Sequence, residues 1–131
     1  MPENTIRLSF IKLAVPELEE AKAFWSGAFG FSQRGYYDEP EFLESIMSIP
    51  EQEAGPSLML LQYKDGRDIT VGGGHGPIGL TTTDIVTTLE SALAAGGTKT
   101  MEITEVVPGV RVCLLVSPQG HEVELVQAGG G

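Results

Sequence analysis

The sequence predicts an α+β protein that contains two copies of a βαβββ module. The octapeptides GPSLMLLQ (residues 55–62) and GHEVELVQ (residues 120–127) share their first glycine, their last glutamine and three apolar positions between them. Further matches recur at a constant offset, pairing Leu13, Glu17, Leu18, Ala28 and Gly30 with Leu80, Asp84, Ile85, Ala95 and Gly97. In each copy three strand-like segments follow a helix-like segment. Matching positions in two separate blocks indicate a duplication.

The first copy begins with a strand and continues into an amphipathic helix. Ile11, Leu13 and Val15 alternate as in a half-buried strand. Pro16 suits the first turn of a helix, and Gly30 suits a left-handed helix end. The helix is predicted from an apolar stripe at three- and four-residue spacing, formed by Leu18, Ala21, Trp25 and Ala28. Strands are then predicted over about 31–37, 42–49 and 57–63.

The second copy repeats this order. Ile78 and Leu80 alternate as a strand, and Asp84 can cap a helix that ends at Gly96 and Gly97. The apolar stripe of that helix is predicted at Ile85, Leu89 and Ala92. Three strands are predicted over about 99–106, 110–116 and 121–127.

The chain is predicted to be a single domain over residues 1–131. Its two modules are expected at about 5–64 and 76–127, joined by a glycine-rich connector over 65–75. Half a domain of this size buries too little surface alone. The modules are therefore expected to share a core or to pair with another chain.

Composition excludes several classes of protein. The formal charge is −10, from 18 acidic and 8 basic residues, so a nucleic-acid binder is disfavoured. No apolar run is long enough for a membrane span, and the N-terminus lacks the pattern of a signal peptide. Cys113 is the only cysteine, which excludes an internal disulfide and a multi-thiolate metal site. We expect a cytoplasmic protein.

Two segments carry a resemblance to a known family. VPELEEAKAFWSGAFGF (residues 15–31) and SPQGHEVELVQ (residues 117–127) resemble motifs of the vicinal oxygen chelate superfamily, which includes glyoxalase I, bleomycin-resistance proteins and extradiol dioxygenases. The chain departs from those motifs at Trp25, Phe29, Ser117 and Gln119. The resemblance implies that each module curls a mixed sheet into half an open barrel whose concave side binds a ligand. It also implies a homodimer, and leaves open whether the modules pair within one chain or across two.

The resemblance implies four metal-ligand positions, at Phe10, Met59, Pro77 and Glu124. Only Glu124 offers a ligand for a hard divalent ion, because the other three carry a phenyl ring, a thioether and a proline ring. His75 is a weak substitute, since it lies two residues before Pro77, about 6–7 Å along a strand, in the loop-like GGGHG. We expect no tightly bound metal and no other cofactor, while a weakly held divalent ion at Glu124 is disfavoured but open.

Strand alternation predicts the lining of the ligand cleft. Either Tyr36 or Tyr37 is expected to face the cleft, and the sequence does not decide which. The predicted ligand-binding residues are Phe10, Lys12, Met59, Leu61, Tyr63, Arg111, Cys113 and Glu122, with Glu124 at the centre. Apolar and aromatic side chains with a few charges are typical of a small-molecule site.

These residues favour a glyoxalase/bleomycin-resistance-like protein that binds a small molecule in an apolar cleft without a tightly bound metal. The alternative is a lyase, isomerase or epimerase that uses Glu124 as general base, with or without a weakly held divalent ion. Desolvation beside Phe10 and Met59 would raise the pKa of Glu124 towards that of a useful base. A third class, a purely structural or interaction module, would lack an occupied cleft.

Overall fold

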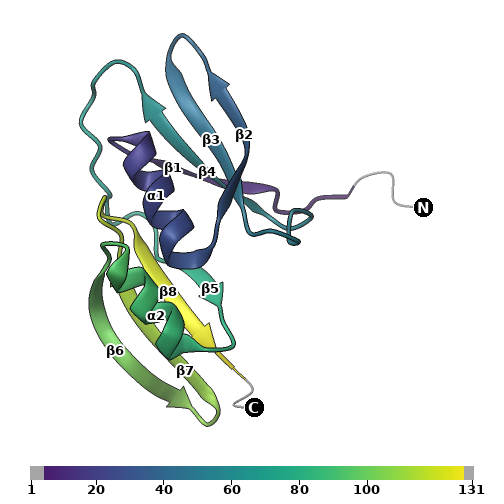
Figure 1. The fold of residues 1–131 in the computed structure, drawn as a ribbon, viewed down its shortest axis with the longest axis vertical. Coiled ribbons are helices and arrows are strands. Elements are labelled where there is room, and N and C mark those ends of the chain that lie inside the picture. Colours follow the sequence, from purple (N-terminus) through teal and green to yellow (C-terminus); the bar gives the residue numbers. More distant parts are fainter. Residues whose placement is uncertain (1–4, 129–131) are drawn as a thin grey trace.

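The computed structural model describes residues 5–128, so the first four and the last three residues of the predicted domain lie outside the described residues. Each module is a four-stranded sheet with one helix on one of its faces (Figure 1). The first module consists of β1 (Phe10–Ala14), α1 (Leu18–Phe29), β2 (Ser32–Asp38), β3 (Phe42–Ser48) and β4 (Ser57–Tyr63). The second consists of β5 (Ile78–Thr81), α2 (Ile85–Ala94), β6 (Thr98–Val107), β7 (Val110–Val116) and β8 (Glu122–Gln127).

Both sheets have the same topology, β1-β4-β3-β2 and β5-β8-β7-β6. The first strand of each module runs parallel to the last strand, and the other neighbours are antiparallel, so both sheets are mixed. This confirms the predicted α+β fold of two βαβββ modules. Each of the six strands predicted after the helices lies within one residue of its expected bounds.

The start of α1 differs from its prediction. Glu17 has an extended backbone and its side chain accepts a hydrogen bond from the Glu20 amide at 3.0 Å, so Glu17 is the N-cap. Pro16 therefore lies before the cap, and its placement in the first helical turn was wrong. Gly30 ends the helix with a φ of 83°, in the left-handed conformation expected for a helix-terminating glycine.

The boundaries of α2 agree with the sequence. The Asp84 side chain accepts a hydrogen bond from the Thr87 amide at 3.1 Å and another from the Thr87 hydroxyl at 2.8 Å. After the helix, a Cβ atom at Gly97 would lie 3.0 Å from the Ala92 carbonyl oxygen and 3.1 Å from Leu115 Cδ1. The close packing of the chain against β7 thus requires a glycine at this position.

One hydrophobic core joins the two modules. Trp25, the predicted core residue of α1, is almost completely buried and its ring packs edge-on against Phe24 and Phe31 at 5.6 Å. Other core side chains come from the helices and from the helix-facing strand positions, including Leu13, Val15, Met47, Leu60, Ile85, Leu89, Leu115, Val123 and Leu125. Within the described residues, neither helix is long and apolar enough to cross a membrane.

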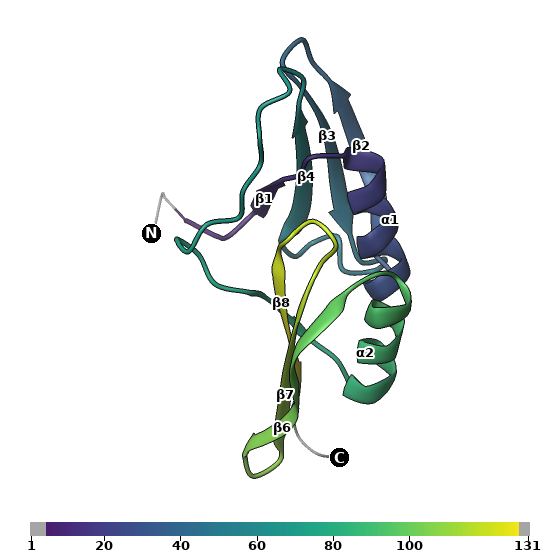
Figure 2. The ribbon, with the colours of Figure 1, turned by 90° about the vertical axis from the view of Figure 1, so that its left-hand side faces the viewer.

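The modules meet mainly where α1 packs against α2 (Figure 1). A second contact is made by the turn between β7 and β8, where Gln119 Nε2 donates hydrogen bonds to the Glu17 carbonyl at 3.0 Å and to Glu20 Oε1 at 2.6 Å. Figure 2 shows both helices on one side of the sheets and the segment from Lys64 to Pro77, which contains no helix or strand, on the other side. The sheet faces opposite α1 and α2 are thus not covered by a helix of their own module (Figure 2).

Candidate functional site

The first sheet turns one set of side chains away from α1. Lys12 is the register partner of Met59, and Ala14 is the partner of Leu61, whereas Leu13 belongs to the core on the other face. The structure therefore places five predicted ligand-binding residues on the face opposite α1, namely Phe10, Lys12, Met59, Leu61 and Tyr63. We call this surface the first face.

Strand β3 adds residues that the sequence analysis did not select. Glu44 is the register partner of Leu61, and Ile46 is the partner of Met59, so both lie on the first face. The alternation of β3 against the core residue Met47 is the signal that could have identified them. Glu44 is the most informative of these residues, because only 5% of it is exposed to solvent.

The choice between the two consecutive tyrosines is resolved by register. Tyr37 is the partner of Glu44 and therefore lies on the first face. Tyr36 is the partner of Ser45, and its ring centroid is 5.7 Å from Lys22 Nζ of α1. Tyr36 thus lies on the helix side of the sheet, and Tyr37 lies on the first face.

An ion pair occupies the first face. Lys12 Nζ lies 3.0 Å from Glu44 Oε2 and 5.7 Å from the centroid of the Phe10 ring. The ammonium is close enough for an ion pair but is not aligned for a hydrogen bond, and Glu44 Oε2 accepts no hydrogen bond from any of residues 5–128. The Lys12 side chain is 45% exposed, so its head group remains accessible.

A hollow of about 260 Å³ lies at the Met59 end of the first face. Arg34 contributes a cation to its wall and donates a hydrogen bond from Nη1 to Ser57 Oγ at 3.1 Å. Ser57 is the register partner of Phe10, which places this hollow beside the start of β1. Arg7 and Glu53 line this hollow as well, so two cations and one anion lie beside Met59, with Lys12 on the neighbouring strand.

The second sheet presents Glu122 and Glu124 on its face opposite α2, which we call the second face. Glu124 is half-buried and is the register partner of Leu114 on β7 and of Gly79 on β5. A Cβ atom at Gly79 would meet nothing within 4 Å, so open space flanks Glu124. Val123, between the two glutamates, is fully buried on the helix side.

The orientation predicted for Arg111 and Cys113 is wrong. These residues are the register partners of Gln127 and Leu125, which face α2 rather than the second face. Cys113 has 0% exposure, and burial raises the pKa of its thiol. Arg111 Nη2 donates a hydrogen bond to Gln127 Oε1 at 3.3 Å. Neither side chain is therefore available to a ligand on the second face.

Met59 and Glu124 hold equivalent positions in the duplicated fold. Lys12 is the β1 partner of Met59, and Gly79, at the corresponding point of β5, is the partner of Glu124. The set of metal-ligand positions implied by the resemblance does not fit a firmly held ion, because one carboxylate stands where three or more ligands are needed. Among residues 5–128, no group of three or more His, Cys, Asp and Glu side chains is arranged to hold a metal.

The two histidines lie apart from these faces. His75 is exposed in the connector, and its Nδ1 is 3.0 Å from the Gly76 carbonyl oxygen. His121 is only 4% exposed and lines a narrow gap against Trp25 of α1, and its Nδ1 has no hydrogen-bond partner among the described residues. Burial lowers the pKa of the His121 imidazole, and the nearby His75 lowers it further.

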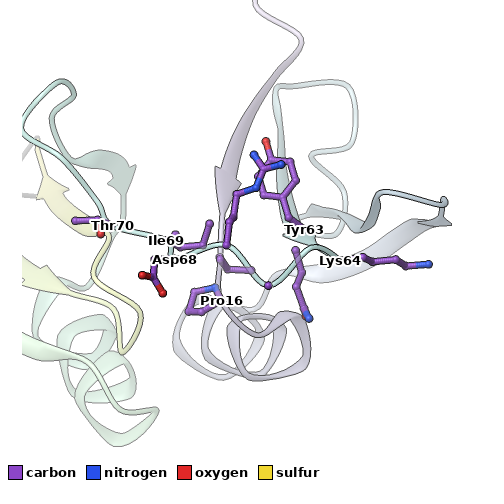
Figure 3. A pocket seen from close by; sticks show the side chains of 10 residues that line it. Pro16, Tyr63, Lys64, Asp68, Ile69 and Thr70 are labelled. Carbon is purple, nitrogen blue, oxygen red and sulfur yellow. The ribbon is translucent and has the colours of Figure 1, made fainter.

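The connector borders a polar pocket at the end of β4. Figure 3 shows Tyr63 and Lys64 on one side of this pocket of about 890 Å³ and Asp68, Ile69 and Thr70 on the other. The Arg67 guanidinium stacks 3.7 Å from the centroid of the Tyr63 ring and forms an ion pair with Asp65 at 2.7 Å. This pairing also lowers the pKa of the Asp65 carboxyl. Tyr63 is therefore partly covered by its own connector.

Within residues 5–128, the hollow at the first face does not extend to the second face. The hollow beside Met59 is formed by the first module, and Glu124 is not part of its wall. A second, largely apolar hollow of about 530 Å³ spans the boundary between the modules, where Ile11 and Leu58 face Ile78 and Leu80. Residues of β1 and β5 thus approach each other at the boundary, whereas Met59 and Glu124 lie on separate sheets.

Comparison with known proteins gives a consistent result. A family model described as the Glyoxalase/Bleomycin resistance protein/Dioxygenase superfamily matches residues 7–125. Glyoxalase I from Zea mays is similar at 21% identity and a TM-score of 0.81, over 90% of this chain and 44% of that chain. This chain therefore spans less than half of the maize enzyme. No curated protein sequence matches the chain.

Two solved structures are similar over nearly their whole length. A glyoxalase family protein from Bacillus cereus has 17% identity and a TM-score of 0.80, with 98% of each chain covered. TnmS3, an antibiotic binding protein from Streptomyces sp. CB03234, has 18% identity and a TM-score of 0.74, over 95% of this chain and 98% of that chain. At these identities the likeness establishes the fold.

Proposed function

Because the chain belongs to the Glyoxalase/Bleomycin resistance protein/Dioxygenase superfamily, we propose that it binds a small organic molecule without a tightly held metal ion. The main support is the first face, where half-buried Met59 and buried Leu61 lie beside the accessible ring of Phe10. An apolar and aromatic surface with few charges suits an organic ligand better than a hydrated ion. Phe10, Met59 and Pro77 occupy three of the positions at which the resemblance implies metal ligands, and their side chains do not suit a hard divalent ion. This also supports binding without a tightly held metal ion.

The proposed ligand is an antibiotic-like molecule with an aromatic or otherwise apolar body. This proposal draws on the likeness to TnmS3, which extends over almost the whole of both chains. Glu122 and Glu124 on the second face suit a donor or cationic group of such a ligand, as does the net charge of −10. The ligand would thus contact apolar side chains of one face and carboxylates of the other.

We further propose that the protein acts as a homodimer in which a second copy completes each cleft. Each sheet has two open edges, and β1 and β5 each form one of them. Apolar side chains of the N-terminal segment are exposed next to the β1 edge, among them Ile6 at 91%. Burial of this surface by a second chain would bring a first face against a second face.

An enzymatic function is the alternative, and the open space beside Glu124 favours it. A half-buried carboxylate next to Gly79 could remove a proton from a carbon beside a carbonyl group, as in a lyase, isomerase or epimerase. No step through a metal ion is needed for this transfer. Replacement of Glu124 by Gln would then abolish turnover while ligand binding remained measurable.

Thermal-shift screening of aromatic antibiotics and their fragments, with and without EDTA, tests the main proposal. We expect ligands that raise the melting temperature equally in both conditions, because binding to the folded state stabilises it. Stabilisation that disappears with EDTA would contradict the metal-free premise. A complete panel without any stabilising compound would contradict small-molecule binding itself.

A further inference from the structure

We propose that Lys12, held in place by the buried carboxylate of Glu44, recognises an anionic oxygen of the ligand on the first face. This inference rests on the small-molecule-binding function proposed above and names the chemical group that the first face selects. A carboxylate, sulfonate or phenolate on an apolar body is the class of ligand that fits. Lys12 is then a specificity-determining residue, and Glu44 is the residue that positions it.

The first support is the geometry of the pair. Lys12 Nζ is 3.0 Å from Glu44 Oε2, while only 7% of the Glu44 side chain and 45% of the Lys12 side chain are exposed. An ammonium group has three N–H donors, and Glu44 lies on one side of it. The accessible part of the head group can therefore offer a donor to a ligand, while the buried carboxylate limits the movement of the lysine side chain.

The second support is the position of Lys12 in the duplicated fold. Lys12 is the register partner of Met59, one of the four positions at which the family resemblance implies a metal ligand. The equivalent neighbour of Glu124 in the second module is Gly79. The first face thus carries a fixed positive charge beside a position that has lost its ability to hold a cation.

The second module forms the same sheet topology without an equivalent ion pair. Glu44 is the register partner of Leu61 on β4, and the equivalent partner of Val126 on β8 is Val112. The second module therefore folds with an apolar side chain where the first has a buried carboxylate. Burial of a carboxylate is costly, and well-packed apolar residues are often as stable as a buried ion pair. A role in recognition accounts for the pair in the first module.

The surroundings of Lys12 suit a ligand whose anionic oxygen is attached to an apolar body. Phe10 and Met59 flank the ammonium and can contact a ring system. Arg34 lies in the wall of the hollow beside Met59 and adds a second cation near that end of the face. Arg7 adds a further cation and Glu53 an anion to the same wall. The charged side chains that line this hollow therefore carry one net positive charge, which favours an anionic group at this point.

Two fluorescent probes with the same skeleton test the inference. One is 8-anilinonaphthalene-1-sulfonate, and the other is N-phenyl-1-naphthylamine, which lacks the sulfonate. The wild-type protein should bind the sulfonate about tenfold more tightly, as expected for one charge-assisted hydrogen bond. The double variant Lys12→Met/Glu44→Leu should lose this preference while it keeps the affinity for the neutral probe. It leaves the net charge unchanged, so long-range repulsion is constant.

The exposed pair of Lys99 and Glu102, whose atoms lie 2.7 Å apart, provides the matched control. The Lys99→Met/Glu102→Leu variant should retain the preference for the sulfonate. Phe10→Ala should weaken the binding of both probes, because both use the first face. If the apolar double variant does not fold, Lys12→Gln/Glu44→Gln serves the same test with uncharged polar side chains.

The outcomes separate this inference from the proposed function. If the neutral probe binds the wild-type protein and the sulfonate has no advantage, Lys12 is not a recognition residue although the site binds small molecules. The same conclusion follows if the folded double variant keeps the advantage of the sulfonate. If neither probe binds the wild-type protein, the inference is wrong, and the thermal-shift panel decides separately whether the small-molecule function also fails.

Discussion

Gln62 and Gln127 each complete the N-terminus of the helix in their own module. Gln62 Oε1 accepts a hydrogen bond from the Leu18 amide at 2.7 Å, and Gln127 Oε1 accepts one from the Ile85 amide, also at 2.7 Å. The first amide groups of a helix have no partner within the helix. The glutamine that closes each of the two repeated octapeptides therefore ties the last strand of a module to its helix.

Replacement of either glutamine by leucine should destabilise the protein. We expect a loss of about 1–2 kcal/mol in the free energy of unfolding for each variant, because a partly buried amide would lose its acceptor. The loss should be larger for Gln127→Leu, since Arg111 Nη2 also donates to this oxygen. Urea titration measures the effect, and Gln52→Leu, in the loop between β3 and β4, is the control. Equal stabilities of all three variants would show that these hydrogen bonds are unimportant.

The sequence predicted the fold and most strand orientations because each module contains at least one strand with clear alternation. In β1 and β8, core residues such as Leu13 and Val123 fix which neighbours face away from the helix. Strand β7 reads VRVCLLV and is apolar on both faces, so alternation could not orient Cys113. The orientation of Arg111 was also predicted wrongly. Its side chain forms a hydrogen bond with Gln127 on β8, and the sequence of β7 alone does not encode this contact.

The remaining features depend on contacts between distant segments. Glu44 ends the acidic stretch DEPEFLE (residues 38–44). Alternation along β3 can place it on the first face, but its pairing with Lys12 appears only in the folded structure. The arrangement of the modules depends on the packing of α1 against α2 and on the hydrogen bonds from Gln119 to Glu17 and Glu20. No local sequence pattern encodes such pairings.

Replacement of Lys12 alone should reduce the stability of the protein more than replacement of Lys12 and Glu44 together. Lys12→Met alone should cost about 1–3 kcal/mol, because it leaves the buried Glu44 carboxylate without its cation. The double variant Lys12→Met/Glu44→Leu should regain most of that loss, since it removes both charges. Urea denaturation of the wild type, both single variants and the double variant forms a complete cycle. Additive losses would indicate that the two side chains do not interact.

The buried imidazole of His121 should make the protein less stable in weak acid. Burial lowers the pKa of His121 in the folded state below the ordinary value of 6.5, so the unfolded chain takes up a proton first as the pH falls. This contribution is fully present above pH 6.5 and decreases with acidification until the pH reaches the folded-state pKa. Below that value it stays constant.

Unfolding of the wild type and of His121→Gln at pH 7.5 and 5.5 measures this contribution. The variant should lose less stability between the two pH values than the wild type does. His75→Gln is the control, because His75 is exposed and should leave most of the pH dependence unchanged. An identical pH dependence in wild type and His121→Gln would show that His121 titrates as an exposed histidine.

The proposed sharing of clefts between two chains can be tested by mixing damaged subunits. Leu61→Arg disrupts the first face and Glu124→Lys disrupts the second, so each homodimer should fail to bind a ligand found in the thermal-shift screen. In a mixed dimer with shared clefts, one cleft carries both changes and the other carries neither. Mixing after partial unfolding should therefore restore up to about one binding site per mixed dimer, as measured by calorimetry.

The alternative arrangement makes the opposite prediction. If each cleft is formed within one chain, every cleft in a mixed dimer carries one of the two changes, and mixing restores no binding. Light scattering on the same samples reports the mass in solution. A protein that stays monomeric at the concentrations used for binding would contradict the shared cleft, and Met59 and Glu124 would then have to contact separate ligands. Restored binding would instead explain why the two faces of one chain lie on separate sheets.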